Sequence, residues 1–222
     1  MNKFEEAPFF AVERKKMVDS QLRARGLRDE RVLAVMGRVP RQPFVTDSDR
    51  AQAYEDHPLP IGLGQTISQP YIVAVMIEAL AIDPSDRILE VGTGSGYVTA
   101  LLSEMASHVY SIERHHALLE RAREILAELG RQNVTFVLGD GSRGLAEFSP
   151  YDAILVSAAT PVIPPSLFTQ LREGGRMVLP VGAPSAQELQ LVVKHNGSPL
   201  IRTLDGCRFV PLVVDDVRSK SH

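Results

Sequence analysis

The stretch Glu-Val-Gly-Thr-Gly-Ser-Gly-Tyr at residues 90–97 combines residue types suited to holding a small ligand. It follows an apolar run and precedes a helical pattern, so its glycines stand at a strand-to-helix turn. Glycine lets a ligand approach the backbone closely, because no Cβ stands in the way. The pattern predicts a binding loop at Gly92, Thr93, Gly94 and Gly96.

The ligand of this loop is predicted to be cationic. A dinucleotide fingerprint requires its third glycine three positions after the second, and that position, counted from Gly94, is Tyr97. Glu90 would repel a pyrophosphate. It suits S-adenosylmethionine, because that molecule carries a sulfonium and an ammonium group.

Two further acids follow the next two predicted strands. Glu113 ends the second strand, where a carboxylate can accept hydrogen bonds from both ribose hydroxyls. Asp140, between Gly139 and Gly141, ends the third strand and is placed to accept from an adenine amino group. A lone glycine-rich turn can also be a plain connection without a ligand. Three acids at three consecutive strand ends favour ligand binding.

Other polar residues are less suited to chemistry. Ser95 lacks the Gly-x-Ser-x-Gly frame of a nucleophile elbow. His115 and His116 would point about 100° apart on a helix, so they are poorly placed to share a metal ion, and no metal site is predicted. A lone loop histidine such as His57 is more often a surface or packing residue than a base. Cys207 is more often a small core residue than a nucleophile.

The elements that would position these residues form three zones. Helical periodicity extends to about Tyr54, with Asp29 as the cap of a helix that Pro40 ends. Residues 55–71 are expected to be a functional loop, because they mix Pro and Gly with apolar and hydroxyl side chains. Alternating strand and helix patterns follow, which predict a parallel sheet with helices on both faces.

The expected elements of the third zone are short. Strands are predicted at 87–91, 108–112, 134–138 and 151–156, and helices at 97–105 and 117–129. After Gly175 the strand patterns have little helix between them, so an antiparallel edge is expected. The predicted strands there are 177–181, 189–194 and a last one around 209–213.

Composition limits the size, partners and location of the protein. The 222 residues suffice for one α/β domain with an appended subdomain, and the net charge of -3 argues against nucleic acid as a partner. Cys207 is the only cysteine, which fits a reducing compartment. The start MNKFEEAPFF carries acids where a signal peptide is apolar, and no apolar run is long enough for a bilayer. A cytoplasmic protein with no membrane partner is expected.

The loop at 59–71, Leu-Pro-Ile-Gly-Leu-Gly-Gln-Thr-Ile-Ser-Gln-Pro-Tyr, closely resembles the signature loop of protein-L-isoaspartate O-methyltransferases. The glycine turn alone would indicate only methyltransferases of the Rossmann-like class, whereas this loop is much more specific. The resemblance covers the chain from about Met17 to Val213, and the first sixteen residues and the tail from Asp215 match nothing. Agreement is also found at 39–41, 44–45, 89–97, 109–114, 139–141, 174–175, 179–182 and 208–212.

The resemblance implies a fold and a domain organisation. The fold is expected to be α/β and Rossmann-like, with a doubly wound, mostly parallel seven-stranded sheet, an N-terminal helical subdomain and an antiparallel C-terminal edge. Residues 1–71 would form the helical segment and the active-site loop. Residues 72–222 would form the domain that binds S-adenosylmethionine. Both parts would belong to a single compact unit, and the protein would be a monomer.

The resemblance also implies the reaction and its residues. A methyl group would pass from S-adenosylmethionine to the free carboxylate of L-isoaspartyl residues in damaged proteins. S-adenosylhomocysteine would be the product, and closure of the ester to a succinimide would begin repair. Ser68 would be the active-site residue, and Val210, Pro211 and Leu212 would offer backbone groups to the substrate. The expected cofactor contacts are Thr66, Ile67, Ser68, Glu90, Gly92, Thr93, Gly94, Gly96, Glu113, Arg114, Asp140 and Gly141.

Elementary chemistry sets what such a site requires. A carboxylate with a pKa of about 4 is already ionised at neutral pH, so no general base is needed. Alignment of the reacting atoms can supply roughly 7–11 kcal/mol. The Ser68 hydroxyl would orient the attacking carboxylate, or it would cap a helix that starts near Gln69.

Two rival functions stay open at this point. One is a methyltransferase of the same fold that acts on RNA or a small molecule, which the acidic balance and the loop at 65–70 oppose. The other is a cofactor-binding module without catalysis, which the intact acids and Ser68 oppose.

Overall fold

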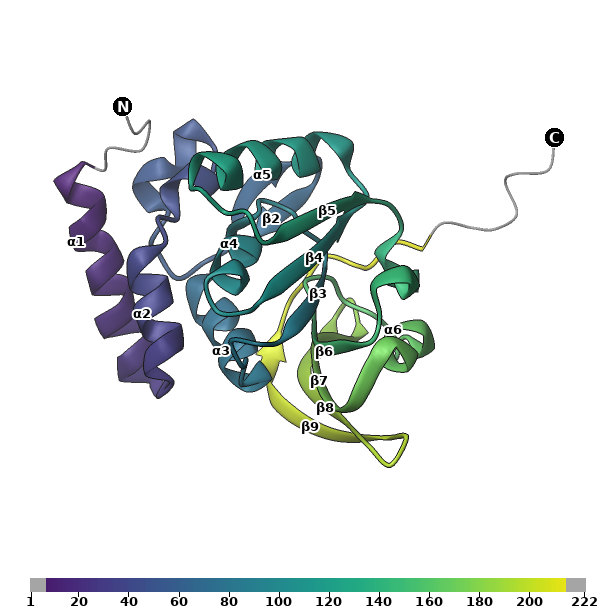
Figure 1. Ribbon diagram of the computed structural model, residues 1–222. Helices are drawn as coiled ribbons and strands as arrows, with labels where there is room; N and C mark the ends of the chain where they lie inside the picture. Colours follow the sequence, from purple (N-terminus) through teal and green to yellow (C-terminus); the bar gives the residue numbers. More distant parts are fainter. Residues whose placement is uncertain (1–6, 215–222) are drawn as a thin grey trace.

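A seven-stranded mixed sheet forms the centre of the computed structural model (Figure 1), which describes residues 7–214. Residues 1–6 and the tail from Asp215 lie outside the described residues, and so does part of the start that argued against a signal peptide. The strands are β3 (Arg87–Val91), β4 (His108–Glu113), β5 (Val134–Leu138), β6 (Tyr151–Val156), β7 (Leu171–Ala183), β8 (Ala186–His195) and β9 (Ser198–Cys207).

The order and direction of the strands confirm the predicted fold. The order is β5-β4-β3-β6-β7-β8-β9, and the first five of these strands are parallel. β8 and β9 pair antiparallel, which gives the expected C-terminal edge. The carboxyl ends of the parallel strands therefore meet along one side of the sheet, where ligands bind in such folds.

Helices cover both faces of the sheet, as predicted. Side chains alternate along each strand, so Ile88 packs into one buried cluster and its neighbour Leu89 into a second. The first cluster takes in α3, α4 and α5, and the second takes in α6 (Figure 1). The helices are α3 (Pro70–Leu80), α4 (Tyr97–Ser103), α5 (His116–Glu128) and α6 (Pro165–Gln170).

The N-terminal part is helical and shares the first cluster. Met17 and Met36 are wholly buried in it together with Ile88 of β3. Asp29 caps α2 as expected, because its side chain accepts from the N–H groups of Arg31 and Val32. The boundary at residue 71 stays a prediction. The elements are α1 (Pro8–Lys16), a π-helical turn (Met17–Leu22), α2 (Glu30–Arg38) and short 3-10 helices (Arg23–Arg25, Gln42–Phe44 and Asp47–Gln52).

The predicted loop at 55–71 contains a small hairpin. β1 (Leu59–Gly62) and β2 (Gln65–Ile67) pair antiparallel and lead directly to α3. The turn between them requires positive φ at Gly62 (93°) and Gly64 (72°), which glycine adopts without strain. The segment that carries Ser68 is therefore anchored at both ends by regular structure.

The strand predicted around 209–213 is wrong. The last strand is β9, which follows β8 through a turn at Asn196 and Gly197 with φ of 49° and 75°. Asn-Gly is a strong hairpin signal, and it places the last strand directly after residue 197, before the segment that the apolar pattern selected. Residues 209–213 make a single bridge, between Pro211 and Ala159, because Pro211 has no N–H with which to extend a ladder.

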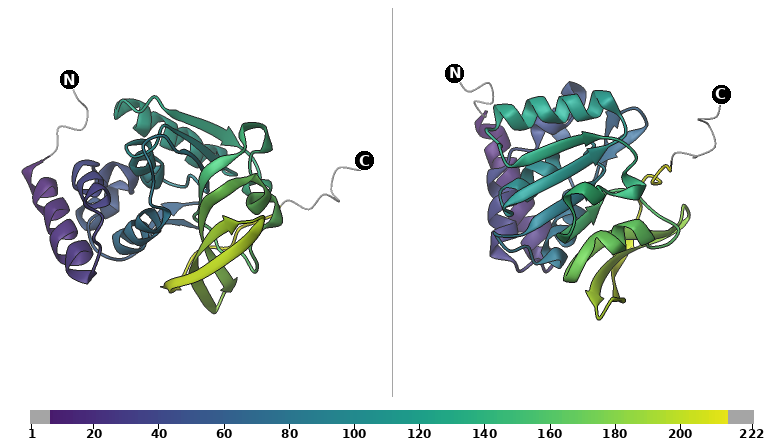
Figure 2. Two further views of the ribbon diagram at one scale, coloured as in Figure 1. Left: turned by 60° about the horizontal axis from the view of Figure 1, so that its bottom comes forward. Right: turned by 45° about the vertical axis from the view of Figure 1, so that its right-hand side comes forward.

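Figure 2 shows α1 and the β7–β9 ribbon at opposite sides of the molecule. Among residues 7–214, every helix is too short or too polar to span a bilayer.

Candidate active site

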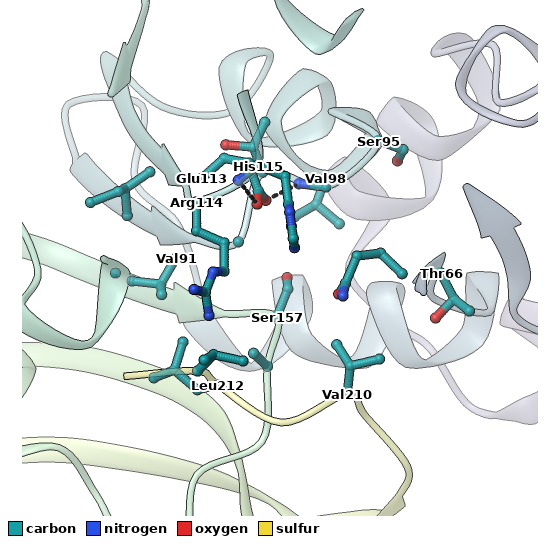
Figure 3. Close-up of a pocket in the computed structure, with 18 of the residues that line it drawn as sticks. Thr66, Val91, Ser95, Val98, Glu113, Arg114, His115, Ser157, Val210 and Leu212 are labelled. Carbon is teal, nitrogen blue, oxygen red and sulfur yellow. Dashed lines mark hydrogen bonds between the residues drawn. The ribbon is translucent and has the colours of Figure 1, made fainter. Parts of the chain in front are cut away.

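A cavity opens at the carboxyl ends of β3, β4 and β6, where the topology predicts a ligand site. Figure 3 shows Glu113, Arg114 and His115 on one side of this space, with Thr66, Ser157, Val210 and Leu212 around it. We call it the nucleoside cavity. Of the predicted residues it is lined by Thr66, Ile67, Ser68, Gly92, Thr93, Gly94, Glu113, Arg114, Gly141, Val210, Pro211 and Leu212.

The glycine turn forms the floor of the nucleoside cavity between β3 and α4. Gly92 and Gly94 have φ of 93° and 53°, a region that other residues avoid. The N–H of Gly92 donates to the carbonyl of Ile112 at 2.9 Å, which ties the turn to the neighbouring strand. Thr93 is buried, and its hydroxyl shares a 2.6 Å hydrogen bond with Ser111. Hydrogen bonds to Ser111 and Ile112 of β4 therefore hold the turn in place.

Glu113 supplies the acceptor that a nucleoside requires. Its Oε2 accepts from the Gly94 N–H and its Oε1 from the His115 N–H, both at 2.9 Å (Figure 3). A carboxylate can accept about four hydrogen bonds, so two positions remain beside the cavity. A pair of ribose hydroxyls fits this donor and acceptor chemistry, so the residues present suit S-adenosylmethionine.

Glu90 does not line the nucleoside cavity. It is wholly buried below the glycine turn, where its Oε2 accepts from the hydroxyls of Thr99 (2.6 Å) and Ser111 (2.5 Å). Burial raises the pKa of Glu90 to about 8, against the effect of those two hydroxyls. Ser111 also hydrogen-bonds Thr93, which lines the cavity. Glu90 is therefore connected to the cavity wall through Ser111 and Thr93.

Gly96 and Asp140 also lie outside the cavity wall. A Cβ at Gly96 would come within 2.8 Å of the Cβ of Ala122, so this glycine lets α5 approach the start of α4. The carboxylate of Asp140 accepts from the Ser142 N–H at 2.9 Å, and the flanking Gly139 and Gly141 line the cavity instead.

The hydroxyl of Ser68 is available for a ligand. It forms no hydrogen bond with any residue of the described chain, and Ser68 is only half-buried. The helix cap considered for Ser68 is wrong, because the N-cap of α3 is Gln69, and the Asp56 carboxylate, not Ser68, accepts from the N–H of Tyr71 in the first turn. The Ser68 carbonyl accepts from Nη2 of Arg41 at 2.6 Å.

A second cavity of about 390 Å³, which we call the peptide cavity, adjoins the first. Thr66, Ser68, Ser157 and Val210 line both cavities and therefore form their common border. Among its lining residues Arg208 alone is charged, and this side chain is exposed and bonds no other described residue. The peptide cavity is otherwise lined by Pro58, Gln69, Ile72, Gly206, Cys207 and Phe209.

The segment 208–213 lines both cavities, the peptide cavity with residues 208–210 and the nucleoside cavity with residues 210–213. The N–H of Ala159 donates to the Val210 carbonyl and the N–H of Leu212 donates to the Ala159 carbonyl, both at 2.8 Å. Pro211 has no N–H, so the carbonyls of Pro211 and Leu212 and the N–H of Val210 remain for a peptide. The side-chain amide of Gln187 holds Phe209, the residue before Val210, because it accepts from the N–H of Phe209 and donates to its carbonyl.

Sequence reasoning missed several lining residues. Ser157 comes directly after β6, so the rule that selected Glu113 at the end of β4 would have selected it too. His115 was weighed only as a metal ligand, although its place two residues after Glu113 puts it on the same wall. Gln65 and Ser95 lie within the two loops that the sequence singled out, whereas Val98 and Ala158 carry no signal of their own, and all four line the nucleoside cavity.

Comparison with known proteins gives one consistent family. Residues 12–217 match the family model of protein-L-isoaspartate(D-aspartate) O-methyltransferase. The chain is 56% identical over 204 residues to a protein-L-isoaspartate O-methyltransferase of Koribacter versatilis, which covers 92% of each chain. It is 54% identical over 201 residues to that of Methanoculleus marisnigri, with 90% of this chain and 91% of the relative covered.

Solved structures agree. One protein-L-isoaspartate O-methyltransferase superposes with a TM-score of 0.79 at 32% identity, over 89% of this chain and 65% of that longer chain. A Plasmodium falciparum protein assigned to the same activity was solved with S-adenosyl-L-homocysteine. It gives a TM-score of 0.78 at 26% identity, over 90% of this chain and 98% of its own.

Proposed function

The chain belongs to the protein-L-isoaspartate(D-aspartate) O-methyltransferase family, and from that premise we propose which of its residues carry out the reaction. It is an S-adenosylmethionine-dependent enzyme that methylates the carboxylate of L-isoaspartyl residues in proteins, the first step of their repair. The rival functions are thereby set aside, because relatives more than 50% identical across about 90% of the chain share this activity.

The nucleoside cavity is the proposed cofactor site. S-adenosylmethionine supplies an activated methyl group there. Glu113 would accept from the ribose hydroxyls through its two remaining lone-pair positions, and Gly92 and Gly94 would leave room along the backbone. Arg114, Gly141 and residues 66–68 would complete the wall.

Three of the predicted cofactor residues would not touch the cofactor and would support residues that do. Glu90 would hold Thr93 through Ser111 and add negative charge beneath the cation when it is ionised. Gly96 would let α4 and α5 pack closely. Asp140 would set the turn that brings its two flanking glycines to the cavity.

The place of Ser68 on the border of the two cavities carries the proposal for catalysis. A residue that orients the nucleophile must touch the substrate and also face the methyl donor, and Ser68 lines both cavities. Its hydroxyl has no competing partner among the described residues, so it would donate to one oxygen of the substrate carboxylate. The other oxygen would remain free to attack. No base is required, because the carboxylate is already ionised.

The peptide cavity is the proposed site for the isoaspartyl residue. Arg208 would attract the substrate carboxylate, since it is the one charged side chain of that wall. Carbonyls of Pro211 and Leu212 and the N–H of Val210 would meet the peptide backbone. Contacts to backbone rather than to side chains would let many flanking sequences bind.

We further propose that one chain suffices, because both cavities are lined from a single chain. A cytoplasmic location is proposed from the use of cysteine. Burial raises the pKa of Cys207 to about 11, so this single thiol is a weak nucleophile that suits a reducing compartment.

The decisive experiment is transfer of a labelled methyl group to paired synthetic peptides that differ only in isoaspartate against aspartate. Label on the isoaspartyl peptide alone is expected. Broad acceptance of flanking residues in a peptide panel is expected as well, and strict dependence on the neighbours would contradict the backbone contacts proposed for residues 210–212. Equal labelling of both peptides would contradict the assignment of the peptide cavity.

A further inference from the structure

Arg41 is a cation enclosed by the protein. Its side chain has no exposed surface, although arginine is rarely buried unless it is paired. No described residue forms an ion pair with it; its partners are backbone carbonyls. Nε donates to the Ala53 carbonyl at 2.7 Å, and Nη2 donates to the Ser68 carbonyl at 2.6 Å.

The same guanidinium lies against the start of α4. Its Cζ is 4.8 Å from the centroid of the Tyr97 ring, and Tyr97 directly follows the last glycine of the turn. That ring is itself buried and packs edge-on against Phe44, with centroids 5.5 Å apart. Arg41 therefore connects the loop that carries Ser68 with the helix that begins at the glycine turn.

Stability alone does not account for an arginine at this position. Burial lowers the pKa of Arg41 to about 10, so the guanidinium is still charged at neutral pH. Its Nη1 is buried without a hydrogen-bond partner, which is unfavourable. An apolar side chain of similar volume would avoid both costs.

We propose that Arg41 is a positioning residue for methyl transfer, which fixes the peptide carbonyl of Ser68 and thereby the direction of the Ser68 hydroxyl. This inference rests on the role proposed for Ser68. The carbonyl belongs to the peptide unit that leads into Gln69, the N-cap of α3. A turn of that peptide unit would move Ser68 away from the border of the two cavities.

The fork of the guanidinium is what the position requires. Two different nitrogens reach two carbonyls, from Ala53 and Ser68, in one fixed plane. A lysine ammonium keeps the charge but cannot hold both carbonyls in the same geometry.

The test is a double-mutant cycle on the full chain with Arg41→Lys, Ser68→Ala and the double variant. The quantities measured are kcat and KM for an isoaspartyl peptide, Kd for S-adenosylhomocysteine, and thermal unfolding. We expect Arg41→Lys to lower kcat about tenfold, because small misplacements of reacting groups can cost up to about 100-fold, and to leave Kd within about threefold. In the Ser68→Ala background its effect on kcat should fall below about twofold.

Arg31→Lys is the matched control. Arg31 also donates to a backbone carbonyl, that of Ile82 at 2.6 Å, but it lines neither cavity. It should lower the unfolding temperature and leave kcat unchanged. If Arg41→Lys does not fold, Tyr54→Phe replaces it, since the Tyr54 hydroxyl accepts from the backbone N–H of Arg41 at 3.1 Å and so helps to place that residue. The substitution also removes the bonds of this hydroxyl to Gln42 and Arg14. It should lower kcat about threefold, again only while Ser68 is present.

Each outcome bears on the inference. A loss of kcat that disappears in the Ser68→Ala background supports it. Equal losses in both backgrounds, or an unchanged kcat in Arg41→Lys, overturn it and leave the role of Ser68 standing. An unchanged kcat in Ser68→Ala itself overturns the role of Ser68 and this inference together.

Discussion

The two halves of the active site are held in different ways. In the cofactor half, Glu113 and the glycine turn stand at the ends of adjacent parallel strands and bond to each other directly. In the substrate half, Ser68 lies in the short link between β2 and α3, and the segment 208–213 is irregular, so neither belongs to the central sheet. Contacts between distant parts of the chain hold them, such as Arg41 to Ser68.

This difference separates two kinds of sensitivity to mutation. Strand ends of a parallel sheet are fixed by the sheet itself, so the cofactor half should lose affinity only when its own residues change. Irregular segments have no such frame, so the substrate half should lose turnover when remote contacts change. The following variants test this division, from the largest expected effect to the smallest.

Replacement of Glu113 should have the largest effect and act on the cofactor alone. Glu113→Ala removes two proposed charge-assisted hydrogen bonds to ribose, so Kd for S-adenosylhomocysteine should rise on the order of 100-fold to 1000-fold. Isothermal titration calorimetry measures this Kd, and KM for the peptide serves as the control. A rise in peptide KM as large as the rise in Kd would show that the two halves are not separate.

Ser68→Ala should act on turnover alone. The loss of one hydrogen bond to a charged carboxylate should lower kcat about 30-fold, with Kd for S-adenosylhomocysteine nearly unchanged. The unfolding temperature should also be unchanged, because no helix is capped by Ser68. Steady-state kinetics and calorimetry check both statements. A stable variant with full turnover would contradict the proposed orientation of the carboxylate.

Arg208→Ala should weaken the peptide and spare the cofactor. Removal of this exposed charge in the wall of the peptide cavity should raise KM for an isoaspartyl peptide about tenfold. The rise should be smaller at high salt, because salt screens exposed charges. Arg208→Lys is the matched control, since it keeps the charge and should recover most of the affinity. Identical KM values for the Ala and Lys variants would show that the charge of Arg208 does not contribute to peptide binding.

Glu90→Gln should have the smallest effect on binding and turnover, and its effect should be visible as a changed pH dependence of stability. Burial raises the pKa of Glu90 from its ordinary 4.5 to about 8, so between these values the unfolded chain has released a proton that the folded chain retains. Folding stability must then fall as pH rises from about 4.5 to about 8, by roughly 1 kcal/mol per pH unit from this group.

The measurement is urea unfolding of the ligand-free protein at several pH values in that range. Glutamine keeps an acceptor for Thr99 and Ser111 but does not titrate, so the difference between the two proteins isolates Glu90. Parallel stability curves for the wild type and Glu90→Gln would contradict the raised pKa.

The cofactor half was largely predictable because its signals are local. The run at 87–91 places the apolar Ile88 and Leu89 on opposite faces, which marks a buried parallel strand, and the turn that follows is encoded by adjacent residues. Thr93, Glu113 and Gly141 are accordingly found on the cavity wall. Glu90 is not, because the direction of a side chain at a strand end depends on the packing of α4 above it.

The substrate half was predictable only through its resemblance to a family. Pattern reasoning alone made residues 209–213 a strand and left two roles for Ser68 open, and the structure excluded the strand and the helix cap. Nothing near Arg41 in the chain indicates that its guanidinium reaches Ser68, twenty-seven residues away. A contact of that kind exists only once both segments have folded onto α4.

The sequence by itself determined the strand-and-helix alternation, the glycine turn with its acid at 113, and the family. These depend on propensity and periodicity over a few neighbouring residues. Only the tertiary structure decided that Glu90 lies buried beneath the turn, that Ser68 borders two cavities, and that Arg41 holds its carbonyl. Burial and long-range hydrogen bonds arise from the packing of separate elements, and no local pattern encodes which distant groups will meet.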